Sequence, residues 1–319
     1  MNQKNQFFID LQNNKYVKIK TLSKNSQSKV YLCHIIEKPK QMYVLKKILL
    51  KYLDLKSQEK TLEEYQIMKK LNHPNIIKCE SAFIQKRKYL CIIIQYAEGG
   101  DMQQKINQMI KNNQKFDQNQ IKIWIIQIID ALKYIHDNKI IHRDIKAQNI
   151  FLNSENNILL GDFGVSKSLE STKDLCNTYV GTPYYIAPEI IDGDHYSFKV
   201  DIWSFGIFFY QLNYLKYPFV GNNILAVYNN IKNSQVQLNQ TVSADFNNLI
   251  QLLLQKLPKN RPDIYQFQGK LYFLFIYFFQ KKYIYTIFQY IIIFQRMKQQ
   301  KKYKKNLKKI IIYNSKIKF

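Results

Sequence analysis

A chain of 319 residues is long enough for one two-lobed enzyme or for two small domains, and a hydrophobic content of 46% permits a sizeable core. The net charge is +25, but residues 270–319 contain 13 basic residues and no acidic one, so the preceding residues carry +12. We interpret that remainder as a solvated surface rather than a nucleic-acid groove, because no nucleic-acid recognition motif accompanies it.

The four cysteines lie far apart, with no C-x-x-C pair and no histidine at ligand spacing: Cys33, Cys79, Cys91 and Cys176. We therefore expect free thiols, no zinc site and a reducing compartment. The first ten residues, MNQKNQFFID, contain no apolar run long enough for a secretory signal.

Between residues 16 and 47 the pattern predicts a strand, a turn and two more strands, with the sequences YVKIKTL, SKNSQS, KVYLCHII and MYVLKKI. Residues 1–15 are interpreted as an extension that precedes this sheet. The turn has no glycine, and none of the nine glycines in the chain precedes Gly99. Lys46 lies on the third strand, where a lysine that faces solvent is the plain alternative to a function.

An apolar stripe at helical spacing predicts a helix that ends before His73-Pro74. The stripe consists of Leu62, Tyr65, Met68 and Leu71. Two predicted strands, ESAFIQ and YLCIIIQYA, lead from there to the turn at residues 98–101. A second stripe predicts a long amphipathic helix with its apolar face in the core, formed by Ile121, Trp124, Ile125, Ile128, Leu132 and Ile135. Trp124 has no role there beyond packing.

Residues 140–166, IIHRDIKAQNIFLNSENNILLGDFGVS, carry polar side chains at a distinctive spacing. Phosphoryl transfer needs a carboxylate near the attacking hydroxyl, a cation on the moving phosphate and ligands for Mg²⁺. The residues of these types are Asp144, Lys146, Asn149 and Asp162. Ordinary polar loop residues between short strands would explain Asp162 or Asn149 alone, but not the full set in this order.

This set resembles a protein kinase, and Lys146 two residues after Asp144 resembles the serine/threonine type. The phrases LNHPNII, YAEGGDM, HRDIKAQNIFL, LGDFG and GTPYYIAPEI are similar to the NIMA-related kinases. The resemblance implies an α+β, two-lobed protein kinase fold over residues 16–268. A small β-rich lobe with helix αC would occupy residues 16–96, and a larger, mainly α-helical lobe would occupy residues 97–268.

The resemblance also implies catalytic roles. Asp144 would orient and deprotonate a Ser or Thr hydroxyl of a protein substrate, and Lys146 would neutralise the transferring γ-phosphate. Lys46 would hold the α- and β-phosphates of ATP and would pair with Glu64 of helix αC. Thr182 would bridge Asp144 and Lys146.

ATP and Mg²⁺ are the implied cofactors, with Asn149 and Asp162 as the magnesium ligands. The residues implied to contact the nucleotide are Leu22, Ser23, Asn25, Ser28, Val30, Val44, Lys46, Ile94, Gln95, Ala97, Asn149 and Asp162. In the family, three glycines let the backbone approach the phosphates. Here Ser23, Asn25 and Ser28 stand at those positions, which departs from the pattern. An edge strand and turn would explain residues 94–101 equally well.

Structural roles are implied for Glu189, which would form a buried ion pair with Arg261, and for Asp201, which would hold the catalytic loop. A phosphate on Thr178 would dock on a basic pocket that includes Arg143 and would order the activation segment. Ser171 and Thr172 are the alternative acceptors, and none of the three hydroxyls need have a role.

Residues 269–319 form a basic, aromatic, low-complexity tail. A membrane span over residues 271–294 is opposed by Lys281 and Lys282 near its middle, where each lysine would cost ~2.5–3.5 kcal/mol. A surface-bound amphipathic segment and an extension without function are the other interpretations, and we favour the last. Contact of the tail with a membrane therefore stays open.

The resulting hypothesis is a cytoplasmic kinase, with association with the cytoskeleton left open by the resemblance. It would phosphorylate Ser and Thr residues of protein substrates, without nucleic-acid partners, and its oligomeric state is not indicated. The alternative is a pseudokinase that acts as a binding scaffold. The missing glycines favour the alternative, whereas Lys46, Glu64, Asp144, Asn149 and Asp162 favour the enzyme.

Overall fold

The structure is a computed structural model, and it describes residues 7–9, 14–24, 28–50, 65, 68–86, 88–161, 167–168, 183–195 and 197–269. The chain divides into two units, Met1–Tyr265 and Gln266–Phe319, and the elements below belong to the first. The following residues singled out above lie outside the described residues: Asn25, Leu62, Glu64, Asp162, Ser171, Thr172, Cys176, Thr178 and Thr182. Most of the tail, residues 270–319, also lies outside them.

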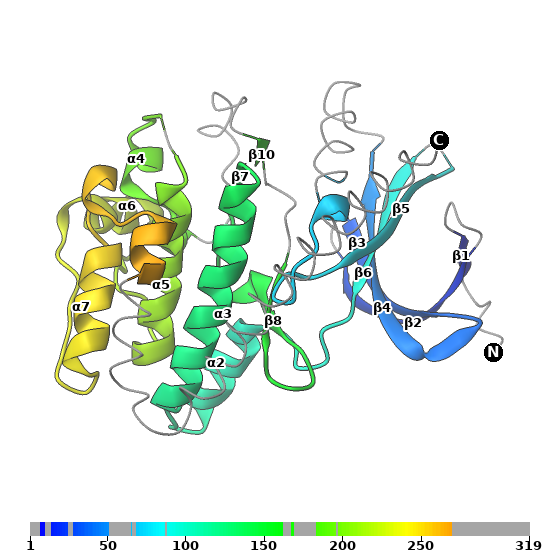
Figure 1. The fold of residues 1–319 in the computed structure, drawn as a ribbon, viewed down its shortest axis with the longest axis horizontal. Helices are drawn as coiled ribbons and strands as arrows, with labels where there is room; N and C mark the ends of the chain where they lie inside the picture. Colours follow the sequence, from blue (N-terminus) through cyan, green and yellow to red (C-terminus); the bar gives the residue numbers. More distant parts are fainter. Residues whose placement is uncertain are drawn as a thin grey trace, which may run out of the picture. The chain divides into compact units, whose positions relative to one another are not determined.

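A six-stranded antiparallel sheet forms the first lobe, with the strand order β1-β2-β3-β4-β6-β5. Its strands are β1 (Phe7–Ile9), β2 (Lys15–Lys24), β3 (Ser28–Ile35), β4 (Lys38–Leu49), β5 (Cys79–Gln85) and β6 (Tyr89–Gln95). The strands predicted from the sequence between residues 16 and 97 are therefore confirmed. The sheet curls at one side of Figure 1, in blue and cyan.

Strand β1 lies within the segment that the sequence analysis treated as an extension. It pairs with β2 in the register Phe8 opposite Tyr16. The Phe8 side chain is 1% exposed and packs in a cluster on one face of the sheet with Tyr16, Tyr31, Tyr43 and Phe83, among others. A second cluster lies on the other face and includes Tyr65, Leu90 and Ile92. The sheet therefore has apolar packing on both faces.

The second lobe is mainly helical (Figure 1), and its first helices begin at aspartate caps. Its helices are α2 (Met102–Lys111), α3 (Gln118–Asp137), α4 (Pro188–Ile191), α5 (Lys199–Tyr214), α6 (Ile224–Asn233) and α7 (Ala244–Leu253). The carboxylates of Asp101 and Asp117 accept backbone N–H groups of the first turns of α2 and α3. The predicted stripe of α3 is confirmed, because all six of its residues are buried.

Helix α5 is buried on almost every side, from Val200 to Asn213, which is typical of a helix at the centre of a lobe. The described residues also form short elements: the strands β7 (Ile140–Ile141), β8 (Ile150–Leu152), β9 (Ile158–Leu160) and β10 (Lys167–Ser168), and the 3-10 turns η1 (Ala147–Asn149), η2 (Pro183–Tyr185) and η3 (Pro258–Asn260). A β-rich lobe and a helical lobe confirm the predicted α+β, two-lobed fold. Among the described residues, no helix has the length and apolar character of a membrane span.

Candidate active site

The loop between β7 and η1 is held by one buried carboxylate. Asp201, near the start of α5, is fully buried and accepts the backbone N–H groups of His142 and Arg143, each at 2.9 Å. It also contacts Nε2 of His136 on α3 at 2.8 Å. Burial alone would raise the pKa of Asp201, but the hydrogen bond and charge of His136 hold it below its usual value. The Asp201 carboxylate thus joins α3, α5 and the loop between β7 and η1.

The backbone of Arg143 has a positive φ of 69°, a conformation that L-residues rarely adopt. The N–H groups of His142 and Arg143 can therefore both point at Asp201, and the chain turns sharply before Asp144. Strain of this kind persists where the surroundings determine it, and here the buried hydrogen bonds do so.

Asp144 is about one-third exposed, with its carboxylate contacted by two neighbours. Lys146 Nζ lies 2.8 and 2.7 Å from the two carboxylate oxygens. The amide nitrogen of Asn149 donates to the backbone oxygen of Asp144 at 2.8 Å and to Oδ2 at 2.7 Å. The structure therefore brings together three of the four polar residues predicted from this loop.

The fourth, Asp162, lies outside the described residues, but the residue before it is fixed from two sides. The N–H of Gly161 donates to the backbone oxygen of Asn149 at 2.9 Å, and its carbonyl lies 3.1 Å from Nε2 of His142. Nδ1 of His142 accepts the N–H of Asp144 at 3.3 Å, so Nε2 carries the proton. His142, for which the sequence predicted no role, therefore links Asp144 to the residue preceding Asp162.

Gly161 lies close to side chains of both lobes, with little space for a Cβ atom. An added Cβ would lie 2.6 Å from Cδ1 of Ile77, which belongs to the segment just before β5. That segment is tied to the second lobe, since Ile77 donates to the carbonyl of Leu160 and Leu160 donates to that of Asn75, both at 2.8 Å. Close backbone approach therefore joins the first lobe to the end of β9.

The register of the first sheet places several predicted nucleotide contacts on one face. Val30 lies opposite both Ser23 and Lys46, and Val44 lies opposite Ile94. Directly opposed residues of an antiparallel pair share a face, so these five face one way, together with Ile92. Leu22 is 43% exposed beside a register irregularity of β2, and Ser28 begins β3.

The residues after Ile94, a predicted nucleotide contact, make contacts within the fold. The N–H of Gln95 donates to the carbonyl of Lys78 at 2.9 Å, so this donor is not available to a ligand. Ala97 is buried and packs with Ile77 and Leu159, at the junction of the two lobes. Any contact of this segment with an adenine would therefore use other backbone groups than the N–H of Gln95.

Tyr185 of η2 connects η1 to α5. Its hydroxyl accepts the N–H of Ala147 at 3.2 Å and donates to the side-chain oxygen of Gln211. Gln211 in turn contacts Gln103 of α2 at 3.2 Å. Burial raises the pKa of Tyr185 well above its usual value, so the hydroxyl stays a donor. The sequence offered no signal for this network, because its members lie on four separate segments.

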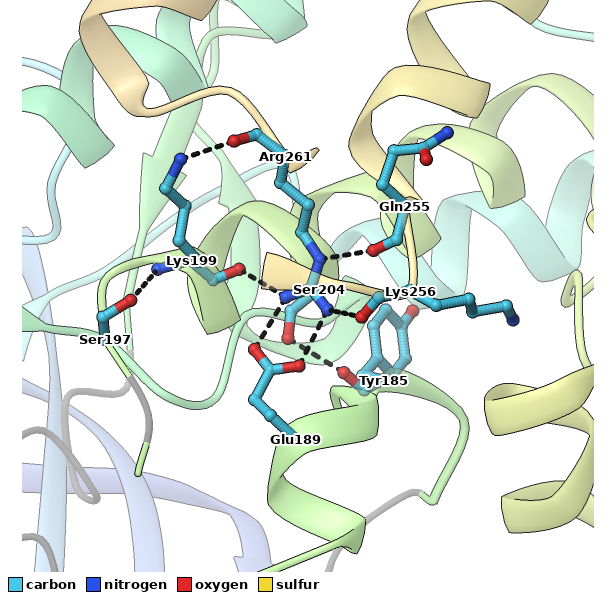
Figure 2. A network of polar contacts seen from close by, with 8 residues as sticks. All are labelled: Tyr185, Glu189, Ser197, Lys199, Ser204, Gln255, Lys256 and Arg261. Carbon is cyan, nitrogen blue, oxygen red and sulfur yellow. Dashed lines mark hydrogen bonds and ion pairs between the residues drawn. The ribbon is translucent and has the colours of Figure 1, made fainter. Parts of the chain in front are cut away.

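Figure 2 shows the second buried carboxylate, Glu189 of α4, with the guanidinium of Arg261. Both pairs of atoms, Nη1 with Oε1 and Nη2 with Oε2, are 2.7 Å apart, which is the bidentate geometry. The remaining N–H groups donate to the carbonyls of Lys199, Gln255 and Lys256. All five donors of Arg261 are satisfied, and Arg261 and Glu189 are 1% and 5% exposed.

The buried thiols carry no reactive character. Burial raises the pKa of Cys33 to about 12 and that of Cys91 to about 11, so both stay protonated and poorly nucleophilic near neutral pH. Cys79 is also a buried free thiol, whose sulfur lies 2.6 Å from the hydroxyl of Tyr65.

A family model for the protein kinase domain matches residues 16–273. The chain belongs to the protein kinase family. It is 36% identical over 251 residues to "Serine/threonine-protein kinase Nek1" of Mus musculus, an alignment that covers 78% of this chain and 20% of that protein. It is 37% identical over 252 residues to "Serine/threonine-protein kinase Nek5" of Homo sapiens, covering 78% of this chain and 35% of the relative.

A third relative is "Serine/threonine-protein kinase Nek3" of Oryza sativa subsp. japonica, 38% identical over 230 residues, which are 72% of this chain and 38% of the relative. The predicted resemblance to the NIMA-related serine/threonine kinases is confirmed. The alignments span less than two fifths of the length of these three relatives.

Proposed function

We propose that this kinase is catalytically active and transfers the γ-phosphate of ATP to Ser or Thr hydroxyls of protein substrates. The observation that carries the proposal is the geometry at Asp144. Its carboxylate is contacted by Lys146 and Asn149 at 2.7–2.8 Å, on a loop whose backbone is anchored to Asp201. The arrangement supports the proposal because phosphoryl transfer needs a carboxylate near the attacking hydroxyl and a cation beside it.

Each side chain has a defined task in the proposed reaction. Asp144 accepts the proton of the substrate hydroxyl, since a carboxylate held in one orientation can act as a general base. Lys146 is a cation beside that carboxylate, where it neutralises charge on the phosphoryl group in transfer. Lys46 on β4 contributes a further cation from the first lobe.

Asn149 fits the role of a magnesium ligand. Its amide nitrogen donates both hydrogens to Asp144, which leaves the amide oxygen for a cation. Amide and carboxylate oxygens suit Mg²⁺, and Gly161 holds the chain next to Asp162 within the same network. A bound Mg²⁺ would supply charge neutralisation on the phosphates of ATP.

The test is phosphate transfer by the purified chain, supplied with γ-labelled ATP, Mg²⁺ and casein as a generic substrate. We expect label in casein with the wild-type chain and background label with the Asp144→Asn and Asp162→Asn variants. Incorporation by the variants at the wild-type rate would point to a contaminating kinase and would overturn the assignment.

The second candidate function is a pseudokinase that binds partners without transfer. Ser23, Asn25 and Ser28 favour it, because a side chain at each of these positions limits how closely the backbone approaches the phosphates. Titration with a fluorescent ATP analogue separates the two candidates. The enzyme is expected to bind the analogue in a Mg²⁺-dependent way, whereas a pseudokinase of this kind would show neither binding nor transfer.

A further inference from the structure

The positive charge that precedes the tail is concentrated in the first lobe. Residues 1–96 contain 19 basic and 7 acidic residues, whereas residues 97–269 contain 16 of each. Within residues 7–50, the described part holds nine lysines and one carboxylate, that of Glu37. The charge therefore belongs to the sheet of the first lobe rather than to the whole surface.

Three of these lysines lie side by side across neighbouring strands. Lys24 of β2 lies opposite Lys29 of β3, and Lys29 lies opposite Lys47 of β4. With neighbouring strands about 4.8 Å apart, their backbone positions span about 10 Å. Like charges directly opposite each other destabilise a sheet, so the alignment departs from ordinary pairing.

Lys86 lies outside this register, in the turn after β5. Burial is the main cause that lowers the pKa of Lys47, and the nearby charges of Lys29 and Lys86 lower it further. We call Lys24, Lys29, Lys47 and Lys86 the lysine row. Among the described residues, no carboxylate forms an ion pair with any of its members.

The centre of the lysine row is fixed in position. Lys47 Nζ donates to Oε1 of Gln85 at 2.7 Å and lies 3.9 Å from the centre of the Tyr89 ring and 5.5 Å from that of Phe8. Cation–π contacts of this kind stabilise an ammonium without neutralising it. The row thus has one fixed ammonium group at its centre, and the mutual repulsion of its cations would be relieved by an anionic ligand.

We propose that the lysine row is a docking surface for an extended acidic segment of a protein partner. Carboxylates on one face of an extended segment recur about every 6.8 Å, a spacing that flexible lysine side chains spread over about 10 Å can meet. The row lies on the face of β4 opposite to that of Lys46, because successive side chains alternate. The inference therefore goes beyond the proposed phosphate transfer.

The surroundings of the row favour a peptide over two other anionic partners. Phe8 and Tyr31, the rings beneath this face, are 1% and 5% exposed, so they cannot stack on nucleic-acid bases. Their burial also leaves little apolar surface to enter a membrane interface. The row consists of lysines, which act as point charges and lack the planar fork with which arginine grips phosphate.

The test compares the full-length wild-type chain with the Lys29→Glu/Lys86→Glu variant and with the control Lys115→Glu/Lys259→Glu, which has the same net charge. All four lysines are exposed, so folding should be retained. Fluorescence anisotropy measures binding of a labelled 20-residue glutamate-rich peptide in 50 mM and 200 mM NaCl. We expect the first variant to bind at least tenfold more weakly than the control at 50 mM NaCl, and the difference to shrink at 200 mM.

An equal loss of peptide affinity in both variants would mean that the peptide binds the basic tail or responds only to net charge, and would overturn the proposal. Two other ligands are tested in the same way: a 20-nucleotide single strand of DNA and vesicles with 30% phosphatidylserine. The proposal would also be overturned if either ligand bound more tightly than the peptide and lost more affinity in the first variant than in the control. A rise in the KM for ATP in the Lys29→Glu/Lys86→Glu variant, with unchanged peptide affinity, would assign the lysines to the nucleotide instead.

Discussion

The proposed role of Asp144 is in the chemistry of transfer, and several of the predicted nucleotide contacts lie in the other lobe. The carboxylate contacts Lys146 and Asn149 on its own loop and lies in the second lobe, whereas Lys46 and the predicted adenine contacts lie on the first sheet and the segment after it. An asparagine there keeps the shape of the side chain and cannot accept the proton. The two functions should therefore be separable by a single substitution.

We predict that Asp144→Asn lowers kcat by roughly 10²–10⁴-fold, the usual contribution of a general base, and changes ATP affinity only a few-fold. Steady-state transfer to casein measures the first quantity, and titration with a fluorescent ATP analogue measures the second. A parallel loss of both would reject the role assigned to Asp144.

Asp201 gives a prediction with a pH dependence. Its pKa is lower in the folded chain than the value of about 3.9 for an unperturbed aspartate. A carboxylate with a depressed folded pKa adds stability that is fully present above about pH 4 and is lost as the pH falls through the folded value. We expect Asp201→Asn to be less stable than wild type at pH 7 by about 1.5–3 kcal/mol, the range for one hydrogen bond to a charged group.

Urea unfolding from pH 7 to pH 2 tests this prediction. The wild-type curve should decline more steeply than that of Asp201→Asn below about pH 4, because the variant has no carboxylate to protonate at that site. Parallel curves would show that Asp201 does not carry the acid dependence.

Among the elements, those with long periodic patterns were predictable and β1 was not. Helix α3 repeats its apolar stripe over 20 residues, and its six predicted core residues are buried. Strand β1 has three residues, too few for a period to be recognised, and Phe8 is buried only because β2 and the ring of Tyr31 cover it. Its role depends on tertiary contacts that no local pattern contains.

We predict that Phe8→Ala destabilises the chain by roughly 3–5 kcal/mol, since the substitution leaves a cavity in the cluster that Phe8 shares with Tyr16 and Tyr31. The matched control is Ile9→Ala on the same strand, where the side chain is 51% exposed and the change should be small. Urea unfolding of both variants provides the comparison. Similar stability of the two variants would mean that β1 adds little to the sheet.

The second prediction at this scale concerns the buried ion pair between Glu189 of α4 and Arg261, the residue after η3. Glu189→Gln or Arg261→Met alone should cost roughly 3–5 kcal/mol, because each leaves a buried charge without its partner. The double variant should cost less than the sum of the two single variants, since no unpaired charge remains. Additive losses in urea unfolding would contradict the coupling.

At the scale of the whole molecule, the sequence predicted the two lobes and the order of the catalytic residues, because ordered motifs are local in sequence. It did not predict the lysine row. Composition places an excess of lysine in residues 1–96, but only the register of three strands puts Lys24, Lys29 and Lys47 opposite one another. The contacts of His136 with Asp201 and of Tyr185 with Gln211 were not predicted either. The partners are separated by 65 and 26 residues, and a local sequence pattern does not contain such contacts.

Regulation belongs to the scale of the whole molecule, since the resemblance to the family predicts that a phosphate orders the activation segment. Thr178, Ser171 and Thr172 lie outside the described residues, so their role rests on spacing and on the family. Arg143 precedes Asp144 and is 6% exposed, with its backbone N–H held by Asp201. We propose that phosphate on Thr178 docks near Arg143, because its charge of about −1.5 to −2 can form one to three charge-assisted hydrogen bonds with basic groups.

We therefore expect Thr178→Ala to lower kcat at least tenfold, with Ser171→Ala and Thr172→Ala as matched controls that retain activity. Mass spectrometry of active protein should find phosphate on Thr178, and phosphatase treatment of the wild-type chain should reproduce the loss seen in Thr178→Ala. Treatment of Thr178→Ala itself should then have no further effect, because the phosphate that matters is already absent. Full activity in Thr178→Ala would reject this switch and would leave the assignment of Asp144 intact, since the carboxylate acts on the hydroxyl whether or not the segment is controlled by phosphate.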